Sequence, residues 1–249
     1  MNCDDVTGNS GLAYKRIVLK LSGDILKGEE LGGIDFRLLE RITVEIASTL
    51  ADGLELGIVV GGGNLFRGTE AERAGYDRIT ADNMGMLSTV INALAIQNAL
   101  EKRGIETRVM SAINIAELVE PFIRRRAIRH LEKGRVVIFA AGTGNPYFTT
   151  DTAAALRASQ IDAQIILKGT KVDGVYDCDP ELCREAVMFD RVDYMEIVKR
   201  GLRIMDLTAV TFCRDHKIPI LVFNIFKPDN FRKIVSGETI GTMVMEIQE

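Results

Sequence analysis

Strand-like and helix-like patterns alternate along nearly the whole chain, and this alternation restricts its fold more than any other feature. Short apolar runs typical of buried strands lie at residues 15–21, 54–60, 105–110, 135–140, 163–167, 219–223 and 242–247. Between them, apolar residues at helical spacing indicate helices at residues 35–50, 80–103, 122–132, 152–159, 195–200, 207–216 and 230–235. This order predicts an α/β fold with a mostly parallel central sheet and helices on both of its faces.

Composition and charge exclude several functional classes. The 249 residues are 47% apolar, and 31 Lys and Arg against 35 Asp and Glu give a net charge of −4, which argues against a nucleic-acid partner. The four cysteines form no C-x-x-C pair, so a disulfide framework is not expected. Cys213 and His216 lack the second pair that a zinc site needs, and we predict no metal site made by protein side chains.

The amino-terminal residues lack the features of a targeting segment. Residues 1–13 are polar and contain glycine, with neither the basic nor the apolar region of a signal peptide. No apolar run approaches the ~20 residues that a membrane span requires. We therefore expect a disordered arm at 1–13, a single domain at 14–249, no membrane association and a cytoplasmic location.

Glycine-rich segments follow four of the predicted strands. They read LSG (21–23), GGGN (61–64), GTGN (142–145) and KGTKVDGV (168–175). Ligands of parallel sheets bind at the carboxyl ends of the strands, and backbone N–H groups of glycine-rich turns can hold phosphate oxygens. One such loop is most simply a chain turn, but four at one sheet edge favour a phosphate-binding cleft.

The common nucleotide-binding signatures are absent. There is no G-x-x-x-x-G-K-[ST] segment, the sixth position counted from Gly61 is Phe66 rather than Gly, and no HRD or DFG triplet occurs. Phosphoryl transfer depends chiefly on positioning and positive charge, which Lys20 and Arg67 could supply beside the glycine turns. From the residues alone, the alternative that both are solvated surface cations stays open.

Six segments carry a more specific pattern: KLSGD (20–24), VVGGGNLFRG (59–68), ADNMGM (81–86), AGTGNPYFTTD (141–151), TKVDGVYDCDP (170–180) and GLRIMDLTAVTFCRDHKIPI (201–220). Together they resemble the bacterial UMP kinase (uridylate kinase) branch of the amino acid kinase family, over about residues 14–247. The resemblance implies a three-layer αβα sandwich, the amino acid kinase fold, in a homohexamer. It also implies ATP-dependent phosphorylation of UMP to UDP in pyrimidine nucleotide biosynthesis. Mg²⁺ would be bound mainly through the nucleotide phosphates.

The same resemblance implies site residues, with the amino-terminal lobe binding UMP and the carboxyl-terminal lobe binding ATP. The catalytic set is Lys20, Arg67 and Asp151. The UMP-binding set is Gly62, Asp82, Thr143, Gly144, Asn145, Pro146, Tyr147, Phe148, Thr149 and Thr150. The ATP-binding set is Lys20, Leu21, Ser22, Gly23, Gly63, Arg67, Thr170, Tyr176 and Asp179.

Each assignment has a structural alternative. Asp151 could instead cap the helix that it opens, Tyr176 could be a packing residue, and Asp206 is by default a helix cap.

No general base is required, because the attacking UMP phosphate oxygen is already ionised at neutral pH. The rival functions are a kinase of the same fold that acts on a carboxylate or carbamate, and a non-catalytic nucleotide sensor.

Nucleotides other than the substrates are expected to regulate the protein. The resemblance implies GTP as activator and UTP as inhibitor, with an effector set of Gly28, Glu29, Glu30, Leu31, Gly32, Gly33, Arg108 and Arg135. Gln97 and Glu101 stand where some GTP-activated relatives have Arg and His, so we expect weak or absent GTP activation.

Three residues depart from the family pattern: Asp24 stands where Glu is more usual, Asn83 where His or Tyr is common, and Gln164 where relatives often have Asp. Loss of that Asp would weaken the organisation of Mg²⁺. Asp173 remains as an organiser of the ion, and a dimer is the alternative to the hexamer.

Overall fold

The computed structural model describes residues 12–28, 32–50, 53–180, 182–183, 185–202 and 204–247. Most of the expected arm at 1–13 and the effector residues Glu29, Glu30 and Leu31 lie outside these described ranges. Nine strands form one sheet in the order β4-β3-β5-β2-β1-β6-β8-β9-β7. All neighbouring strands are parallel except β8 and β9, which confirms the mostly parallel sheet.

The strands are short and largely buried, as expected for a sheet covered on both faces. Their bounds are β1 Arg16–Leu21, β2 Glu55–Val60, β3 Thr107–Ser111, β4 Glu120–Pro121, β5 Val136–Ala140, β6 Ile165–Thr170, β7 Arg191–Val192, β8 Ile220–Asn224 and β9 Thr242–Val244. Strand β1 lies at the centre, paired with β2 on one side and β6 on the other. The loops that follow these strands therefore meet at one edge of the sheet.

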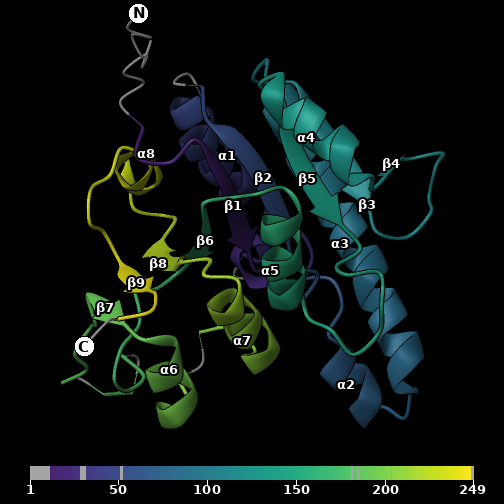
Figure 1. The fold of residues 1–249 in the computed structure, drawn as a ribbon. Coiled ribbons are helices and arrows are strands. Elements are labelled where there is room, and N and C mark those ends of the chain that lie inside the picture. Colours follow the sequence, from purple (N-terminus) through teal and green to yellow (C-terminus); the bar gives the residue numbers. More distant parts are fainter. Residues whose placement is uncertain are drawn as a thin grey trace, which may run out of the picture.

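Helices cover both faces of the sheet (Figure 1). Their bounds are α1 Phe36–Leu50, α2 Gly68–Arg73, α3 Arg78–Glu101, α4 Arg124–Glu132, α5 Thr150–Gln160, α6 Tyr194–Arg200, α7 Leu207–Asp215 and α8 Asn230–Val235, with a 3₁₀ turn η1 at Gly23–Leu26. Buried residues of α1, α3 and α8 belong to one apolar cluster, and those of α4 to α7 belong to a second. These are the two helical layers of an αβα sandwich.

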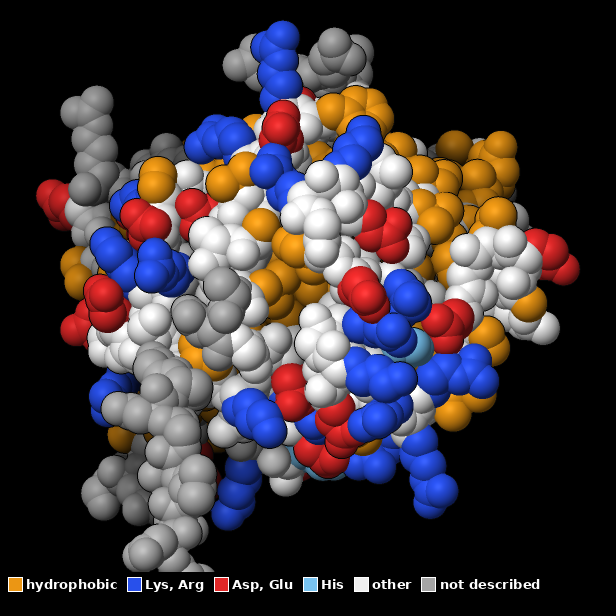
Figure 2. Space-filling view, turned by 90° about the horizontal axis from the view of Figure 1, so that it is seen from above, with side chains coloured by type: hydrophobic (Ala, Val, Ile, Leu, Met, Phe, Trp, Pro, Cys, Tyr) orange, Lys and Arg blue, Asp and Glu red, His pale blue; other side chains and the backbone are white. Residues whose placement is uncertain are grey.

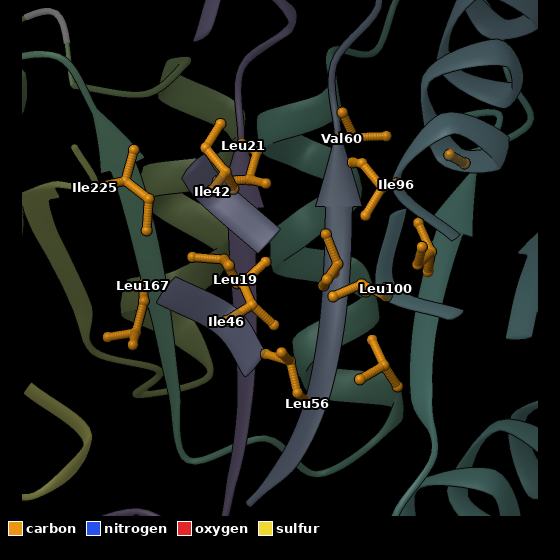
Figure 3. Packing of buried hydrophobic residues seen from close by; sticks show 14 of the residues in the cluster. Leu19, Leu21, Ile42, Ile46, Leu56, Val60, Ile96, Leu100, Leu167 and Ile225 are labelled. Atoms are coloured by element: carbon orange, nitrogen blue, oxygen red, sulfur yellow. The ribbon is translucent and has the colours of Figure 1, made fainter. Parts of the chain in front are cut away.

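Alternation along β1 assigns its side chains to the two layers. Leu19 and Leu21 pack with Ile42 and Ile46 of α1, as Figure 3 shows, whereas Val18 joins the other cluster. Because side chains alternate between the faces of a strand, Lys20 shares the face of Val18, where α5 packs. Lys20, near the carboxyl end of β1, therefore lies on the α5 side.

Four short elements were not predicted: η1, α2, β4 and β7. Each has six residues or fewer, too few to show a periodic pattern. Helices α3 and α5 each start two residues before the predicted position, because polar side chains cap positions further upstream. Asp77 accepts from the backbone N–H groups of Ile79 and Thr80, so α3 begins before Thr80, and Thr149 caps α5.

Among the described residues, no helix combines the length and the apolar character needed to cross a bilayer.

Candidate functional site

The loops after β1 and β2 pack against each other at the carboxyl edge of the sheet. A Cβ atom at Gly61 would lie 2.7 Å from the backbone nitrogen of Gly23, so no side chain fits between the two segments. The Gly63 position is open by comparison, with only Asp24 within 4 Å. Close approach of backbones thus explains Gly61, whereas Gly63 leaves space for a ligand.

A buried ionic cluster lies where β1, β6 and α5 meet. Lys20 and Lys168 are register partners on adjacent parallel strands, and the Asp151 carboxylate contacts both. The Lys168 Nζ lies 3.1 Å from Asp151 Oδ2, and it also donates to the carbonyl oxygen of Ile204. The side chains are 5%, 12% and 15% exposed for Lys20, Lys168 and Asp151, so the two cations share one largely desolvated anion.

Burial and charge act in opposite directions on the pKa values of this cluster. Burial alone would raise the pKa of Asp151, but the attraction of Lys20 and Lys168 holds it below the ordinary value, so the carboxylate is ionised. Burial, followed by repulsion from Lys20, lowers the pKa of Lys168 to about 8. Asp151 opposes that decrease and keeps most of Lys168 charged at neutral pH.

Asp151 is not the cap of its helix. Thr149 fills that role, because its hydroxyl oxygen accepts from the backbone N–H groups of Asp151 and Thr152. The Asp151 side chain is free to turn toward the lysines, which favours the charge-organising interpretation of this residue over the capping alternative.

Asp206 joins two helices at the site. Its carboxylate accepts from Ala209 N–H at 2.9 Å, and so caps α7, as expected. It also accepts from the hydroxyls of Thr152 on α5 and of Thr149, the residue that caps this helix. Because the Thr149 hydroxyl donates to Asp206 and accepts two helix N–H groups, its hydrogen-bonding capacity is already used within the protein.

A first cavity of about 340 Å³ opens on the β2 side of the ionic cluster. The predicted UMP residues that line it are Gly62, Asp82, Thr143, Asn145, Phe148, Thr149 and Thr150. Gly63 and Arg67, which were predicted to bind ATP, also line this first cavity and not the second one described below. Gly144, Pro146 and Tyr147 belong to the same loop but do not line the cavity. Most of the predicted UMP set is therefore brought together in one place.

The two charged side chains predicted to bind substrate, Arg67 and Asp82, are already paired with other lining residues. Arg67 forms an ion pair with Asp24 and donates to the carbonyl oxygen of Gly63 at 3.2 Å. Asp82 accepts from Arg78 Nε at 2.8 Å and from the backbone N–H of Tyr147 at 2.6 Å. Asp82 therefore connects α3 to the 143–150 loop.

A second cavity of about 590 Å³ lies on the β6 side, and Ser22, Thr170, Tyr176 and Asp179 of the predicted ATP set line it. Lys168 lines it as well. Leu21 is fully buried in the core, so its side chain cannot reach a ligand, and only its backbone could. The ionic cluster lies between the two cavities, because Asp151 follows Thr150 of the first and Lys168 lines the second.

Lys168 is the main residue that sequence reasoning missed. The prediction ended the strand at residue 167 and placed Lys168 in the glycine-rich segment KGTKVDGV (168–175), without a role of its own, whereas the structure places it within β6. A signal was present, since IVLK (17–20) and IILK (165–168) place a lysine at the same point of two strands. Adjacent parallel pairing of those strands then brings the two lysines side by side.

Those predicted effector residues that the structure describes line neither of the two cavities. Arg135 Nε lies 2.6 Å from Glu106 Oε2, and Arg108 Nε lies 3.8 Å from Glu120 Oε1, beside His130. Figure 2 shows a region where basic and acidic side chains gather around a histidine. Gly33 lies elsewhere and exchanges hydrogen bonds with Asn64 of the GGGN loop.

Two expectations about Mg²⁺ change with the structure. Gln164 lies at the amino-terminal end of β6, where its Oε1 accepts from Lys15 N–H at 2.6 Å. The suggestion that Gln164 weakens Mg²⁺ organisation is therefore wrong, because Gln164 is at the opposite edge of the sheet. Asp173 is paired with Lys227 at 2.8 Å and with Asn224. Within the described ranges, no group of three or more His, Cys, Asp or Glu side chains is placed to hold a metal ion.

Comparisons with known proteins agree with this geometry. The model of the amino acid kinase family matches residues 15–224. The crystal structure of UMP kinase from Bacillus anthracis has a TM-score of 0.91 at 39% identity, covering 94% of this chain and 97% of that one. The UMP kinase from Ureaplasma parvum has a TM-score of 0.87 at 39% identity, with 93% and 99% covered. The uridylate kinase from Archaeoglobus fulgidus has a TM-score of 0.71 at 31% identity, with 92% and 99% covered. The chain therefore belongs to the amino acid kinase family, and UMP kinases match it over nearly its whole length.

Proposed function

We propose that this chain is a UMP kinase, which transfers the γ-phosphoryl group of ATP to UMP and releases UDP and ADP for pyrimidine nucleotide biosynthesis. The observation that carries the proposal is the buried Lys20–Asp151–Lys168 cluster between two cavities. One cavity suits the acceptor and the other the donor. Whole-chain similarity to UMP kinases supports the choice of acceptor.

The reaction needs charge and alignment rather than a general base. An ionised oxygen of the UMP phosphate attacks the γ-phosphorus of ATP, and the bond to the β-phosphate oxygen breaks as ADP leaves. Negative charge spreads over the equatorial oxygens between the two sites. Lys20 and Lys168 lie at that junction, and Arg67 can reach it from the first cavity after releasing Asp24.

The first cavity supplies the groups that a uridine monophosphate requires. Asp82 can accept hydrogen bonds from both ribose hydroxyls, and the 143–150 loop offers backbone and hydroxyl groups to uracil and phosphate. The N-terminus of α5 faces this loop and favours an anion. Thr150 is better placed than Thr149 to bind the ligand, since the Thr149 hydroxyl is occupied by Asp206.

The second cavity would take ATP, with Thr170, Tyr176 and Asp179 around the adenosine. Mg²⁺ would neutralise and align the transferring phosphates. Asp151, Asp24 and Asp173 are each paired with a cation, so the residues fit an ion held mainly by nucleotide oxygens and water rather than by a carboxylate cage.

The two rival functions predict different acceptors or no turnover. A carboxylate or carbamate kinase would not need the GTGNPYFTT loop that lines the first cavity. A non-catalytic sensor would not need the complete charged set of Lys20, Arg67 and Asp151. Both observations favour the UMP kinase.

For assembly and regulation, we propose a homohexamer that UTP inhibits at the UMP site and that GTP activates weakly or not at all. Gln97 donates to Glu101 Oε1 at 3.0 Å, so a carboxylate stands where a cation would attract a triphosphate. Unfavourable charge at this exposed position should weaken GTP binding by about 10- to 30-fold. Initial rates at fixed UMP, titrated with GTP, test this proposal, and strong activation at low micromolar GTP would contradict it.

An ADP-release assay with ATP and Mg²⁺ tests the reaction itself. The acceptors are UMP, CMP, dTMP, AMP, acetylglutamate and carbamate. UMP should be strongly preferred, and turnover of CMP at a comparable rate would overturn the assignment of the first cavity to UMP.

A further inference from the structure

Two cysteines lie on one loop beside the second cavity. The loop is closed at its base by antiparallel backbone contacts: Phe189 N–H donates to the Val175 carbonyl at 2.8 Å, and a bridge joins Tyr176 to Met188. Beyond this base, the tip carries Cys178 and Cys183, both half-buried. The base fixes where the tip lies relative to the cavity.

A single turn brings the two thiols together. The backbone N–H of Cys183 donates to the carbonyl oxygen of Asp179 at 2.8 Å, which closes one helical turn at the tip. Cys178 directly precedes this turn, and its side chain is within hydrogen-bonding reach of the Cys183 side chain. A disulfide needs its two cysteines this close, and the thiols meet without any rearrangement of the loop base. In contrast, Cys213 is fully buried in the core and has no such access.

The same tip forms part of a wall of the second cavity. Cys178 lines that cavity together with Tyr176, Asp179 and Pro180. A bond between Cys178 and Cys183 would shorten the turn that contains Asp179 and Pro180. A covalent bond between the two cysteines would therefore move residues that we assign to ATP binding.

We propose that Cys178 and Cys183 form a reversible intramolecular disulfide that lowers the affinity of the second cavity for ATP. The oxidant is a low-molecular-weight disulfide such as that of glutathione. The effect on ATP rests on the function proposed above, whereas formation of the disulfide does not.

The chemistry balances as two thiol–disulfide exchanges. The Cys183 thiolate attacks one sulfur of the small disulfide, which leaves a mixed disulfide and releases one small thiol. Cys178 then loses its proton to solvent and attacks the Cys183 sulfur, which releases the second small thiol. Two protein thiols are oxidised, and one small disulfide is reduced to two thiols.

The environment of Cys178 sets this order. Its hydrogen bond to Cys183, followed by burial and by the neighbouring Asp177, raises the pKa of Cys178 to about 12, so Cys178 is protonated and does not attack first. Capture of Cys183 in the mixed disulfide removes the largest of these effects. The disulfide would close a short ring at a half-exposed tip, the kind of bond that thiols reduce readily.

The test compares the reduced and oxidised full-length protein. After treatment with glutathione disulfide, peptide mapping by mass spectrometry should find Cys178 joined to Cys183. The dissociation constant for ATP, measured by calorimetry, and the KM for ATP should each rise about fivefold, while the KM for UMP stays within about twofold. Dithiothreitol should reverse the change.

Cys183→Ser is the matched variant, because Cys183 does not line the cavity. It should keep the parent affinity for ATP and lose the response to oxidation, whereas Cys213→Ser should respond like the parent. The proposal is overturned if no Cys178–Cys183 peptide forms, if the bond forms without a change in ATP affinity, or if Cys183→Ser responds like the parent. Failure of the proposed function would appear separately, as absence of UMP phosphorylation by the reduced protein.

Discussion

Replacing Asp151 with Asn removes the one anion shared by Lys20 and Lys168 while keeping the shape of the side chain. Both ammonium groups are largely desolvated, and the pKa of Lys168 is already lowered to about 8 by burial and by Lys20. Asp151 is the first of the opposing influences that raise that pKa. In Asp151→Asn, the pKa of Lys168 must therefore fall further, and the lysine loses its proton at neutral pH.

We expect Asp151→Asn to lower both the catalytic rate and the stability of the protein. Loss of one preorganised positive group at the transferring phosphoryl should lower kcat about 10²–10³-fold, which corresponds to ~2.7–4 kcal/mol of transition-state stabilisation. Removal of one partner of a buried ion pair costs roughly 3–5 kcal/mol, and deprotonation of Lys168 relieves part of that cost. The variant should thus be less stable than the parent but folded.

The pH dependence of kcat/KM for ATP gives the sharpest test, because it reports pKa values of the free enzyme. In Asp151→Asn, the ratio should rise as the pH is lowered through neutrality, because Lys168 regains its proton. Asp215→Asn is the control, since Asp215 is an exposed carboxylate paired with Arg214 at the end of α7. If Asp151→Asn kept a kcat within about threefold of the parent and a parental pH profile, the charge argument would be refuted.

Three further predictions follow from the same geometry. In the unmodified protein, kcat/KM for ATP should fall as the pH rises through about 8, because Lys168 then becomes neutral; a level profile well above that pH would contradict this. Lys20→Ala and Arg67→Ala should each lower kcat about 10²–10³-fold with little change in the KM for UMP, and steady-state kinetics that show an unchanged kcat in both would exclude this role. Asp82→Asn should raise the KM for UMP more than it lowers kcat, because the ribose does not react; a fall in kcat at constant KM would argue against the assignment.

The layers of the fold could be predicted from local patterns. The apolar runs around Leu19 and Leu167 and the helical spacing of Ile42 and Ile46 record which faces are buried, and burial of both sheet faces is what an αβα sandwich requires. Asp206 was predicted as a helix cap for the same reason, since a cap depends only on residues two or three positions away. Features that depend only on nearby residues of one element can be predicted from the sequence of that element.

From the sequence, site residues could be predicted only where they lie next to the ends of strands. Lys20 was found because it precedes a glycine turn, but its relation to Lys168 depends on β1 and β6 pairing in parallel with those residues in register. Nothing local to either strand sets that pairing, which follows from how the helices cross over the sheet. The same limit applies to Asp206, whose cap is local but whose bonds to Thr149 and Thr152 join helices more than fifty residues apart in sequence.

A glycine in the sequence does not by itself show why a glycine is needed at that position. Gly61 and Gly63 are two positions apart, yet packing against the backbone of Gly23 excludes a side chain from the first, whereas the second faces a cavity. Both demands select glycine, since each requires a backbone without a Cβ atom nearby. A Gly61→Ala variant should therefore lose stability whether or not a nucleotide is bound, whereas the effect of Gly63→Ala should fall mainly on nucleotide affinity. Thermal unfolding with and without UMP separates the two, and equal destabilisation by both substitutions would show that the loop has only a packing role.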